Sequence, residues 1–553
     1  MNQKIYETKS CRGCKNTFHI TNTDIEFYEK ASPIFWWKKY SIPTPTLCPE
    51  CRNNRRLAFR NERNLYKRKC DATGEDIISI YSPESEYTVY NMNMWLSDRW
   101  DGIDYGTNID FTKPIIPQFD VLLKQVPRIP SFQFENENSE YTNGSQKNKD
   151  CYMIFVSDYN QDCAYTNGTF YSEDSLDCLG LNKSLHCYEC IDTDNCRNCF
   201  YSQDLIWCND VYFSKKCENC NHCYFCDGLI NKEYCINNIQ YTKEEYFDKI
   251  KNLQWVKDKA WEWVHLYYHW ANIEWSTWDF IRNAKNALNC FESQEIEDCK
   301  NMTYWVQIKN CHDGYVVVDN SENCYEIVSC IANYNSLFVY CSWNNNRCYY
   351  VDTCENSEDL FLCAGLKNKR YCIMNKQYTK EEYLELVPKI IAHMKETWEW
   401  WEFFSTALSP FWYNETVAQE YYPLTQEEAV KRWYKWNTYE APFPKVEKII
   451  PAEKLPNDIS GIPDDILAWA IECEITKKPF RIIGPELDFY RKHNLPIPKR
   501  HPDQRHLDRM SLRNPRKLYE RNCDKCSKNI ESTYAPERKE TVYCEECYNK
   551  EIY

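Results

Sequence analysis

The chain contains few glycines: 12 among its 553 residues, beside 20 tryptophans. This is about 2% glycine, whereas globular proteins usually have about 7%. Several tryptophans stand in contexts where a turn would favour glycine, and these are Trp37, Trp398, Trp401, Trp412 and Trp433. The sequence therefore predicts that these side chains are exposed, or lie where a positive φ suits only glycine.

Long apolar runs are missing as well. No window approaches the roughly 18 uninterrupted apolar residues of a membrane helix, and the N-terminal MNQKIYETKSCRGC lacks the apolar segment of a secretory signal. We expect a cytoplasmic protein that does not contact a membrane. Its 33 cysteines should then be reduced, as metal ligands or small buried residues; a disulfide framework is the alternative, with one thiol left over.

Catalytic motifs are also lacking. The sequence contains no P-loop, GxGxxG, HExxH or GxSxG, and its 10 histidines are scattered. Acidic residues occur at predicted corners, such as Asp192, Asp194 and Asp210, where solvated carboxylates are expected. We expect a protein that is not an enzyme, with no small-molecule substrate evident.

The two ends of the chain are copies of one another. Residues 42–94 align with residues 495–547 at a constant offset of 453, and the preceding segments align at an offset of 462. Each copy carries two four-ligand sets in series, of which one is intact. The intact sets are Cys11, Cys14, Cys48 and Cys51, and Cys523, Cys526, Cys544 and Cys547. The decayed sets are Cys70, Thr73, Asn91 and Met94, and Cys473, Thr476, His501 and Gln504.

Paired CxxC knuckles place four thiolates around one tetrahedral metal ion, which leaves no open position. We therefore predict two structural zinc ions per chain, one in each intact set. A third site built on Cys473 and His501 would need ligands from elsewhere.

The stretch after the first intact set is basic and has changed little between the copies. The aligned arginines are Arg52, Arg56, Arg60 and Arg63 in the first copy, and Arg505, Arg509, Arg513 and Arg516 in the second. Arg52, Arg56 and Arg60 fall on one face of a helix. Guanidinium groups bind phosphate bidentately, so we predict contacts to RNA or a ribonucleoprotein. The alternative is that these arginines bind carboxylates, within the chain or on a partner protein.

Between the ends lie 23 cysteines, most of which follow a nine-residue period that is clearest from Cys190 to Cys235. A short fixed period with small residues in register is typical of a β-solenoid, and two nonapeptides would make a coil of about 18 residues. A second block repeats the first, because residues 226–246 align with residues 363–383. Capping boxes predict helices after Thr242, Thr379 and Thr425.

The predicted fold is thus mainly β: a duplicated, cysteine-rich parallel β-solenoid with capping helices, flanked by two duplicated zinc-ribbon modules. Seven segments are expected: an N-terminal zinc-ribbon module (1–100), a linker (101–148), a first solenoid block (149–240), a helical connector (241–285), a second solenoid block (286–377), a helix with an extended arm (378–470), and a C-terminal zinc-ribbon module (471–553).

One run of central cysteines permits another interpretation. Cys217, Cys220, Cys223 and Cys226 have the spacing of an iron–sulfur ligand set. Three of them already belong to the ninefold pattern, and Asp227 replaces the proline that usually follows such a run. A metal-cluster or thiol redox enzyme remains the second alternative.

Four motifs resemble a known group of proteins: LCPECRNNRRLAFRNERNLYKRKC, the CYEC and CRNC nonapeptides, SPFWYNETVAQEYYPLT, and HPDQRHLDR with the following CDKC and VYCEEC. Over nearly the full chain, the order of these motifs resembles uncharacterised cysteine-rich proteins of reduced-genome candidate-phylum bacteria. About 27 residues from Cys523 onward resemble small bacterial zinc-ribbon proteins of the CxxC…VYCxxC type. The resemblance implies an architecture and a zinc-stapled hairpin, but no activity.

Some reduced-genome bacteria read UGA as glycine. A translation that reads UGA as tryptophan would produce the observed imbalance between glycine and tryptophan.

In function, we expect a zinc-binding scaffold or binding protein that contacts RNA or a ribonucleoprotein, with a protein–protein scaffold as the alternative.

Overall fold

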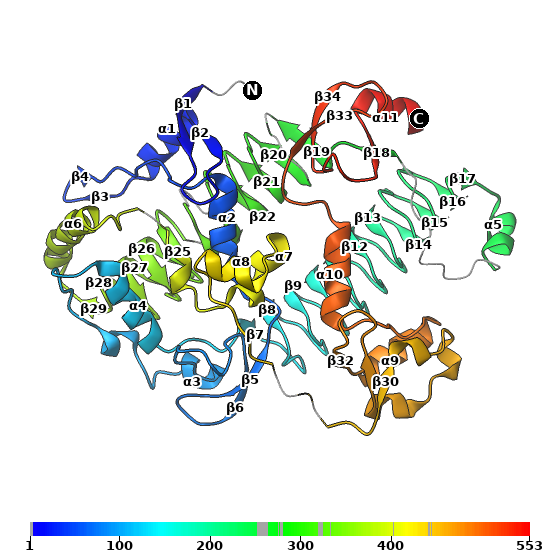
Figure 1. Cartoon of the computed structure of the whole chain (residues 1–553), viewed down its shortest axis with the longest axis horizontal. Coiled ribbons are helices and arrows are strands. Elements are labelled where there is room, and N and C mark those ends of the chain that lie inside the picture. The colour runs from blue at the N-terminus through cyan, green and yellow to red at the C-terminus, as the bar shows by residue number, and fades with distance from the viewer. Residues whose placement is uncertain are drawn as a thin grey trace. The chain divides into compact units, whose positions relative to one another are not determined.

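Figure 1 shows the computed structural model of the chain, which describes residues 4–251, 264–274, 276, 280–318, 325–331, 333–401, 403–440, 443 and 445–552. The chain divides into two compact units, and neither is a continuous stretch of sequence. The first unit comprises Met1–Pro130, Leu266–Thr438 and Pro515–Arg538. The second comprises Ser131–His265, Tyr439–Asn514 and Lys539–Tyr553.

A parallel β-solenoid forms the body of each unit, which confirms the predicted fold class. The first unit holds an 11-stranded sheet: β19 Trp270–Glu274, β20 Ile281–Lys285, β21 Phe291–Glu297, β22 Thr303–Lys309, β23 Tyr315–Val318, β24 Val328–Ile331, β25 Leu337–Tyr340, β26 Asn346–Asp352, β27 Glu358–Ala364, β28 Arg370–Ile373 and β29 Lys376–Gln377. The second holds sheets of seven and four strands: β7 Gln133–Phe134, β8 Asn143–Gln146, β9 Phe155–Asp158, β10 Asn167–Phe170, β11 Leu179–Asn182, β12 Ile191–Asp194 and β13 Gln203–Ile206; β14 Asn209–Tyr212, β15 Asn221–Tyr224, β16 Glu233–Ile236 and β17 Ile239–Gln240.

The remaining elements are short. At the N-terminal side they are β1 Ile5–Ser10, β2 Thr17–Thr21, α1 Asn22–Ala31, β3 Ile34–Phe35, β4 Lys38–Lys39, α2 Pro49–Leu57, β5 Tyr66–Lys69, β6 Asp76–Ser79, α3 Met92–Leu96 and α4 Ile115–Gln125. In the middle they are α5 Lys243–Ile250, β18 Val264–Leu266, α6 Lys380–Glu396, α7 Val417–Tyr421 and α8 Gln426–Lys431. At the C-terminal side they are β30 Ile449–Pro451, β31 Ala470–Glu472, β32 Pro479–Phe480, α9 Gly484–Lys492, α10 Pro502–Leu512, β33 Tyr519–Asn522, β34 Asn529–Ser532, β35 Thr541–Tyr543 and α11 Glu545–Ile552.

The coil of the solenoid is 12 residues long, as the strand register shows, so the predicted coil of about 18 residues is wrong. Asn167 of β10 lies beside Leu179 of β11, which lies beside Ile191 of β12. The nine-residue spacing reflects a different contact between neighbouring coils. The Cys190 thiol donates a hydrogen bond to the carbonyl oxygen of Cys199 at 3.0 Å. Residues nine apart are therefore neighbours across the coil boundary, although they are not stacked in register.

Each coil turns at every third residue. From Lys147 to Asn237, every third residue has a positive φ, between 45° and 74°. Twelve residues per coil therefore make four triplets. Only three of these positions are glycine, namely Gly168, Gly180 and Gly228. A left-handed residue with a side chain costs about 1 kcal/mol or more, and regular backbone hydrogen bonds offset this cost. For example, the N–H of Lys183 donates to the carbonyl oxygen of Phe170 in the coil before.

The central cysteines follow the left-handed corners and point into the core. None of the cysteines that the structure describes forms a disulfide. In the second unit, eleven of them form a buried cluster with Leu181, Leu205 and Val211. Cysteine takes over positions that asparagine and serine hold in earlier coils: Asn148, Asn160 and Ser172 bond to one another along one interior row. The thiols act here as small buried residues, as predicted.

The predicted capping boxes are confirmed. Thr242, Thr379 and Thr425 each accept a hydrogen bond from the backbone N–H of a glutamate three residues later, at the starts of α5, α6 and α8. Both solenoids end in the same antiparallel hairpin, β16–β17 and β28–β29. The predicted helical connector at 241–285 is only partly helical, because β19 and β20 already belong to the sheet of the first unit; residues 252–263 lie outside the described residues.

The prediction about tryptophan holds at four positions, and at three of them the side chain is also exposed. Trp37, Trp398 and Trp433 have φ values of 65°, 62° and 66°, and their side chains are 94%, 91% and 88% exposed. Trp401 also has a positive φ but is buried. Trp412 has a φ of −86°, so the prediction is wrong there. Among the described residues, no helix combines the length and hydropathy needed to cross a bilayer.

Candidate metal centres and arginine clamps

Four cysteine thiols converge in the N-terminal module. The Sγ atoms of Cys11, Cys14, Cys48 and Cys51 all lie within 4.8 Å of one another. Cys11 and Cys14 occupy the turn between β1 and β2, while Cys48 caps α2 and Cys51 lies in its first turn. The N–H of Cys48 donates to the Cys11 Sγ at 3.2 Å, and a hydrogen bond with Cys51 lowers the pKa of Cys48 to about 5. The set provides four ligands for one metal ion.

A second group of four thiols converges near the C-terminus. Cys523, Cys526, Cys544 and Cys547 also have their Sγ atoms within 4.8 Å of one another. The knuckle geometry matches the first set. The N–H of Cys523 donates to the carbonyl oxygen of Lys528 at 2.8 Å, just as Cys11 donates to Asn16 at 2.8 Å. Both predicted sets are thus assembled and can hold a metal ion. We call them the first and second four-cysteine sets.

The two decayed sets keep the knuckle without the ligands. Cys70 donates through its N–H to Glu75 at 2.8 Å, and Cys473 donates to Lys478 at 3.0 Å. In the decayed set of the first copy, the N–H of Asn91 donates to the Cys70 Sγ at 3.1 Å. This matches the bond between Cys48 and Cys11 in the intact set. Hydrogen bonds therefore preserve the ribbon where the metal ligands have been lost.

The solenoid cysteines that the structure describes do not gather into a four-ligand set. Among the described residues, groups of three or more ligand atoms within 4.8 Å occur at three places, none of which includes Cys217, Cys220, Cys223 or Cys226. Cysteines three residues apart follow successive corners of the coil, and their thiols share its buried interior, but no three of the described ones have their sulfur atoms within 4.8 Å of one another. The thiols of Cys217 and Cys220 donate instead to the carbonyl oxygens two residues before them.

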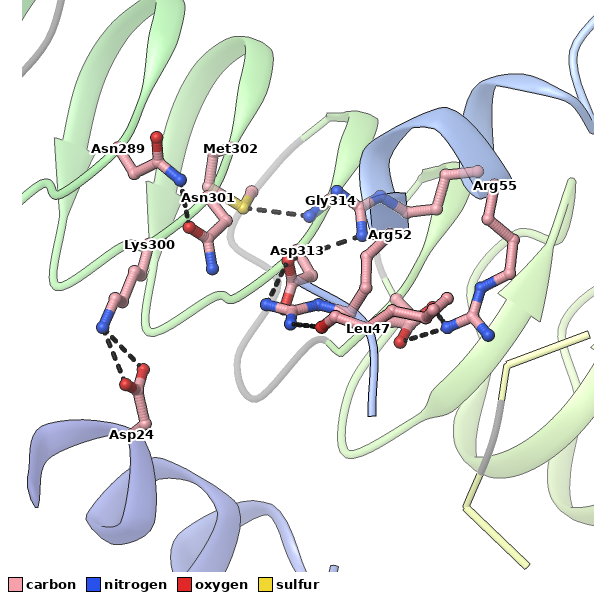
Figure 2. A network of polar contacts seen from close by, with 12 residues as sticks. Asp24, Leu47, Arg52, Arg55, Asn289, Lys300, Asn301, Met302, Asp313 and Gly314 are labelled. Carbon is pink, nitrogen blue, oxygen red and sulfur yellow. Dashed lines mark hydrogen bonds and ion pairs between the residues drawn. The ribbon is translucent and has the colours of Figure 1, made fainter. Parts of the chain in front are cut away.

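The arginines of α2 face the solenoid of the first unit (Figure 2). Arg52 donates through Nη2 to Asp313 at 2.9 Å and through Nη1 to the Leu47 carbonyl oxygen at 2.7 Å. Arg56 Nη1 lies 3.4 Å from the same carboxylate, and Arg55 Nη2 donates to Glu326 Oε1 at 2.7 Å. All five ionic side chains are buried. We call this group the first clamp.

The arginines of α10 face the solenoid of the second unit in the same way. Arg505 pairs with Asp177 and with Glu486, the latter at 3.3 Å. Arg509 Nη1 lies 3.0 Å from Asp177 Oδ1 and 3.7 Å from Glu189 Oε1. We call this group the second clamp.

The two clamps share the position of their acids on the coil, although Arg55 of the first has Asp508 at the aligned position of the second. Asp313 and Asp177 both occupy left-handed corners, with φ values of 61° and 53°. In each clamp a second acid, Glu326 or Glu189, stands directly over that aspartate on the next coil. The spacing is 13 residues in the first unit, where Tyr315 pairs with Val328, and 12 in the second, where Leu179 pairs with Ile191.

The other predicted arginines are also engaged within their own units. Arg60 bonds to Glu62 at 3.1 Å and to Ser329, and Arg513 pairs with Asp192. Arg516 pairs with Glu292 at 2.6 Å, while Arg63 is buried. Asp192 was expected to be solvated, and that expectation is wrong. These contacts correspond to the alternative in which the arginines bind carboxylates of the chain, and they do not support phosphate contacts through these guanidinium groups.

Sequence reasoning missed the acidic halves of the clamps. Burial raises the pKa of Glu326 and of Glu486, so each depends on its arginines to remain ionised. One signal was available: Asp177 and Asp313 both have an acid one coil later, at Glu189 and Glu326.

Comparisons with known proteins add little. No family model and no curated protein matches the chain. Among solved structures, the chain is similar to a candidate acetyltransferase from Desulfovibrio desulfuricans G20, at 8% identity and a TM-score of 0.10. That alignment covers 43% of this chain and 65% of the other, which is less than two thirds of its length. A likeness this low carries no argument about function.

Proposed function

We propose that the protein is a zinc-stabilised scaffold, in which each four-cysteine set binds one structural zinc ion. Four thiolates at the corners of a tetrahedron are the ligand set of structural zinc sites, which have no position left for a substrate. The observation that carries the proposal is the convergence of all four Sγ atoms in both sets. The role of the metal is then to fix the shape of the chain.

In the first module the metal site and the clamp share one helix. Cys48 and Cys51 hold the N-terminal end of α2, and Arg52 follows immediately. A metal ion at this end would fix the direction in which the helix presents Arg52, Arg55 and Arg56 to the solenoid acids. Zinc binding is therefore coupled to the docking of the module on the solenoid in this proposal.

The partner of such a scaffold follows from charge. The net charge is −15, and the arginine clusters at both ends are used within the units. An acidic surface repels phosphate backbones and attracts basic ones. We therefore propose a partner protein with a basic surface, rather than RNA, as the binding target.

Metal analysis of the purified chain tests the proposal. We expect two zinc ions per chain that survive dialysis against a weak chelator, and no iron; four irons per chain would instead support the redox alternative. An RNA mobility-shift assay at about 50 mM salt should show no binding. A salt-dependent shift that is lost in the double variant Arg56→Glu/Arg509→Glu would overturn the proposal in favour of RNA.

A further inference from the structure

A third group of metal-ligating side chains lies in the second unit, separate from both four-cysteine sets. The ligand atoms of Asp174, His186 and His493 all lie within 4.8 Å of one another. Asp174 and His186 occupy left-handed corners of adjacent coils, with φ values of 45° and 55°. His493 follows the last residue of α9. The sheet corner and the helix end thus bring three ligands together.

The imidazole of His493 is held by aromatic neighbours. Its ring lies 4.5 Å from that of Phe489 and 5.2 Å from that of Phe200, between ring centroids. Its Nε2 atom is buried and has no hydrogen-bond partner among the residues that the structure describes. Buried polar atoms without partners are rare in folded proteins, and this one belongs to an imidazole that has a ring nitrogen within 4.8 Å of ligand atoms of His186 and Asp174.

The duplicated architecture shows that packing does not require these residues. At the offset of 462, α9 aligns with α1, and His493 falls on Ala31. Asp174 precedes the clamp residue Asp177 by three positions, and the residue three positions before Asp313 is Asn310. The first unit therefore has an equivalent clamp with alanine and asparagine at these two places. The two units share the clamp, whereas the second unit alone has Asp and His at these two positions.

We propose that Asp174, His186 and His493 bind one divalent first-row transition-metal ion of the zinc class. Two imidazoles and one carboxylate suit such ions, and three protein ligands leave a position for water or another exchangeable ligand. The site differs in this respect from the closed four-cysteine sets, and it stands independently of the proposed scaffold function. The bound ion would also tie the end of α9 to the solenoid.

Lys492 is the group that the ion displaces. Its Nζ donates to Asp174 Oδ2 at 2.5 Å, and 55% of its side chain is exposed. The long side chain can turn to solvent when a doubly charged ion takes its place beside the carboxylate. His186 Nδ1, now 2.8 Å from the same oxygen, then becomes a ligand beside Asp174 instead of its hydrogen-bond partner.

Cobalt titration of the full-length chain tests the site, after dialysis against a weak chelator has left zinc only in the two four-cysteine sets. We expect one additional Co²⁺ per chain, with the weak visible bands of nitrogen and oxygen ligands and without thiolate charge-transfer bands. The variants His493→Ala and Asp174→Asn carry the residues that the first unit has at the equivalent places, so both should fold. We expect each to lose the additional Co²⁺, or to bind it at least about tenfold more weakly.

His222→Asn is the matched control. His222 lies on the same row of corners and contacts Asp210 at 3.7 Å, but it is not part of the triad, so this variant should bind the additional ion like the wild type. Thermal unfolding of each variant checks that the fold is retained. The proposal is overturned if the wild type binds no additional Co²⁺, or if His493→Ala binds it as tightly as the wild type does.

Discussion

The two clamps hold equivalent helices on equivalent corners, but they secure the helix start differently. In the first unit, the N-cap of α2 is Cys48, a member of an intact four-cysteine set. In the second, the N-cap of α10 is His501, whose Nδ1 accepts the N–H of Asp503 at 3.2 Å. There, the Sγ atom of Cys473 accepts a hydrogen bond from the N–H of Thr476 at 3.4 Å. The helix therefore docks its arginines on the solenoid in both units, whether its start is held by four metal ligands or only by a cap and hydrogen bonds.

The loss of ligands next to an unchanged arginine pair is informative. Arg52 and Arg56 correspond to Arg505 and Arg509, and each pair meets one buried aspartate. A buried carboxylate cannot lose its arginine partners without a large penalty, whereas a knuckle can replace its metal with backbone hydrogen bonds. The clamp is therefore the more constrained half of the module.

The strongest test of this comparison removes one cysteine from each copy. Cys48→Ser should lose one zinc ion and unfold the N-terminal module, because structural zinc supplies about 10 kcal/mol or more of folding free energy in zinc-finger peptides. Cys473→Ser should leave the metal content unchanged. Metal analysis combined with limited proteolysis measures both. Equal zinc content in Cys48→Ser and the wild type would contradict the assignment of this site.

The next test breaks each clamp from the solenoid side. Asp313→Ala and Asp177→Ala each leave two buried arginines without their shared carboxylate, so the free energy of unfolding should fall by about 3–5 kcal/mol. Urea denaturation at neutral pH measures the loss. Asp194→Ala is the control outside the clamps: this carboxylate lies at the end of β12 and accepts only from the amides of Asn182 and Asn195 among the contacts seen, so its loss should cost less than about 1 kcal/mol. A loss below that value in both clamp variants would mean that the arginines find other partners.

A pH test separates the two units. Burial raises the pKa of Glu415, in the first unit, from 4.5 to about 7, and that of Asp158, in the second, from 3.8 to about 6. A carboxyl group whose pKa is raised on folding stabilises the folded state fully below its unfolded pKa. That stabilisation is lost as the pH rises through the folded pKa. For Glu415 the loss falls between pH 4.5 and about 7, and for Asp158 between pH 3.8 and about 6.

Two variants isolate these windows. Relative to the wild type, Glu415→Gln should gain stability as the pH is raised from about 5.5 to about 8, by about 2 kcal/mol. Asp158→Asn should gain less over this range, because most of its window lies lower. Urea denaturation across this pH range provides the comparison. A constant difference between Glu415→Gln and the wild type would show that Glu415 does not titrate there.

The smallest effects concern tryptophan. Trp398→Gly and Trp433→Gly should each stabilise the chain by about 1 kcal/mol, because a left-handed backbone disfavours any residue with a Cβ. Trp401→Gly is the contrasting variant: its φ is also positive, but the indole is buried, so its removal should destabilise the chain. Thermal unfolding measures all three. Mass spectrometry of the protein from its source organism would show directly whether glycine occupies these positions, and tryptophan at Trp398 and Trp433 would refute the decoding hypothesis.

Local patterns in the sequence were enough to predict the metal sites and the helix starts. The Cys11 and Cys523 knuckles depend on a few consecutive residues, as do the capping boxes at Thr242 and Thr379. The solenoid was predicted with the wrong coil length. The cysteines repeat every nine residues because residues nine apart are neighbours between coils. The positive φ at every third residue does not require one residue type, so it produces no sequence pattern. Asn, Asp, His, Tyr and Phe all occupy those corners.

The residues that the arginines bind could not be predicted from the local pattern. Arg52 meets Asp313, a residue 261 positions later in the chain, and Arg505 meets Asp177. A basic helix looks the same in the sequence whether it binds phosphate or a distant carboxylate. Only the folded chain distinguishes the two, by burying the guanidinium groups.

The triplet coil has a consequence for length. Each 12-residue coil adds one strand to the stack, and neighbouring strands are about 4.8 Å apart, so the stack grows by only about 0.4 Å per residue, compared with about 1.5 Å in a helix. The step of 13 residues between β23 and β24 still leaves these strands paired in parallel, so the coil accommodates an extra residue. The length of such a solenoid is therefore set by its number of coils. Gene duplication lengthens it by whole coils, whereas a one-residue insertion adds no strand to the stack.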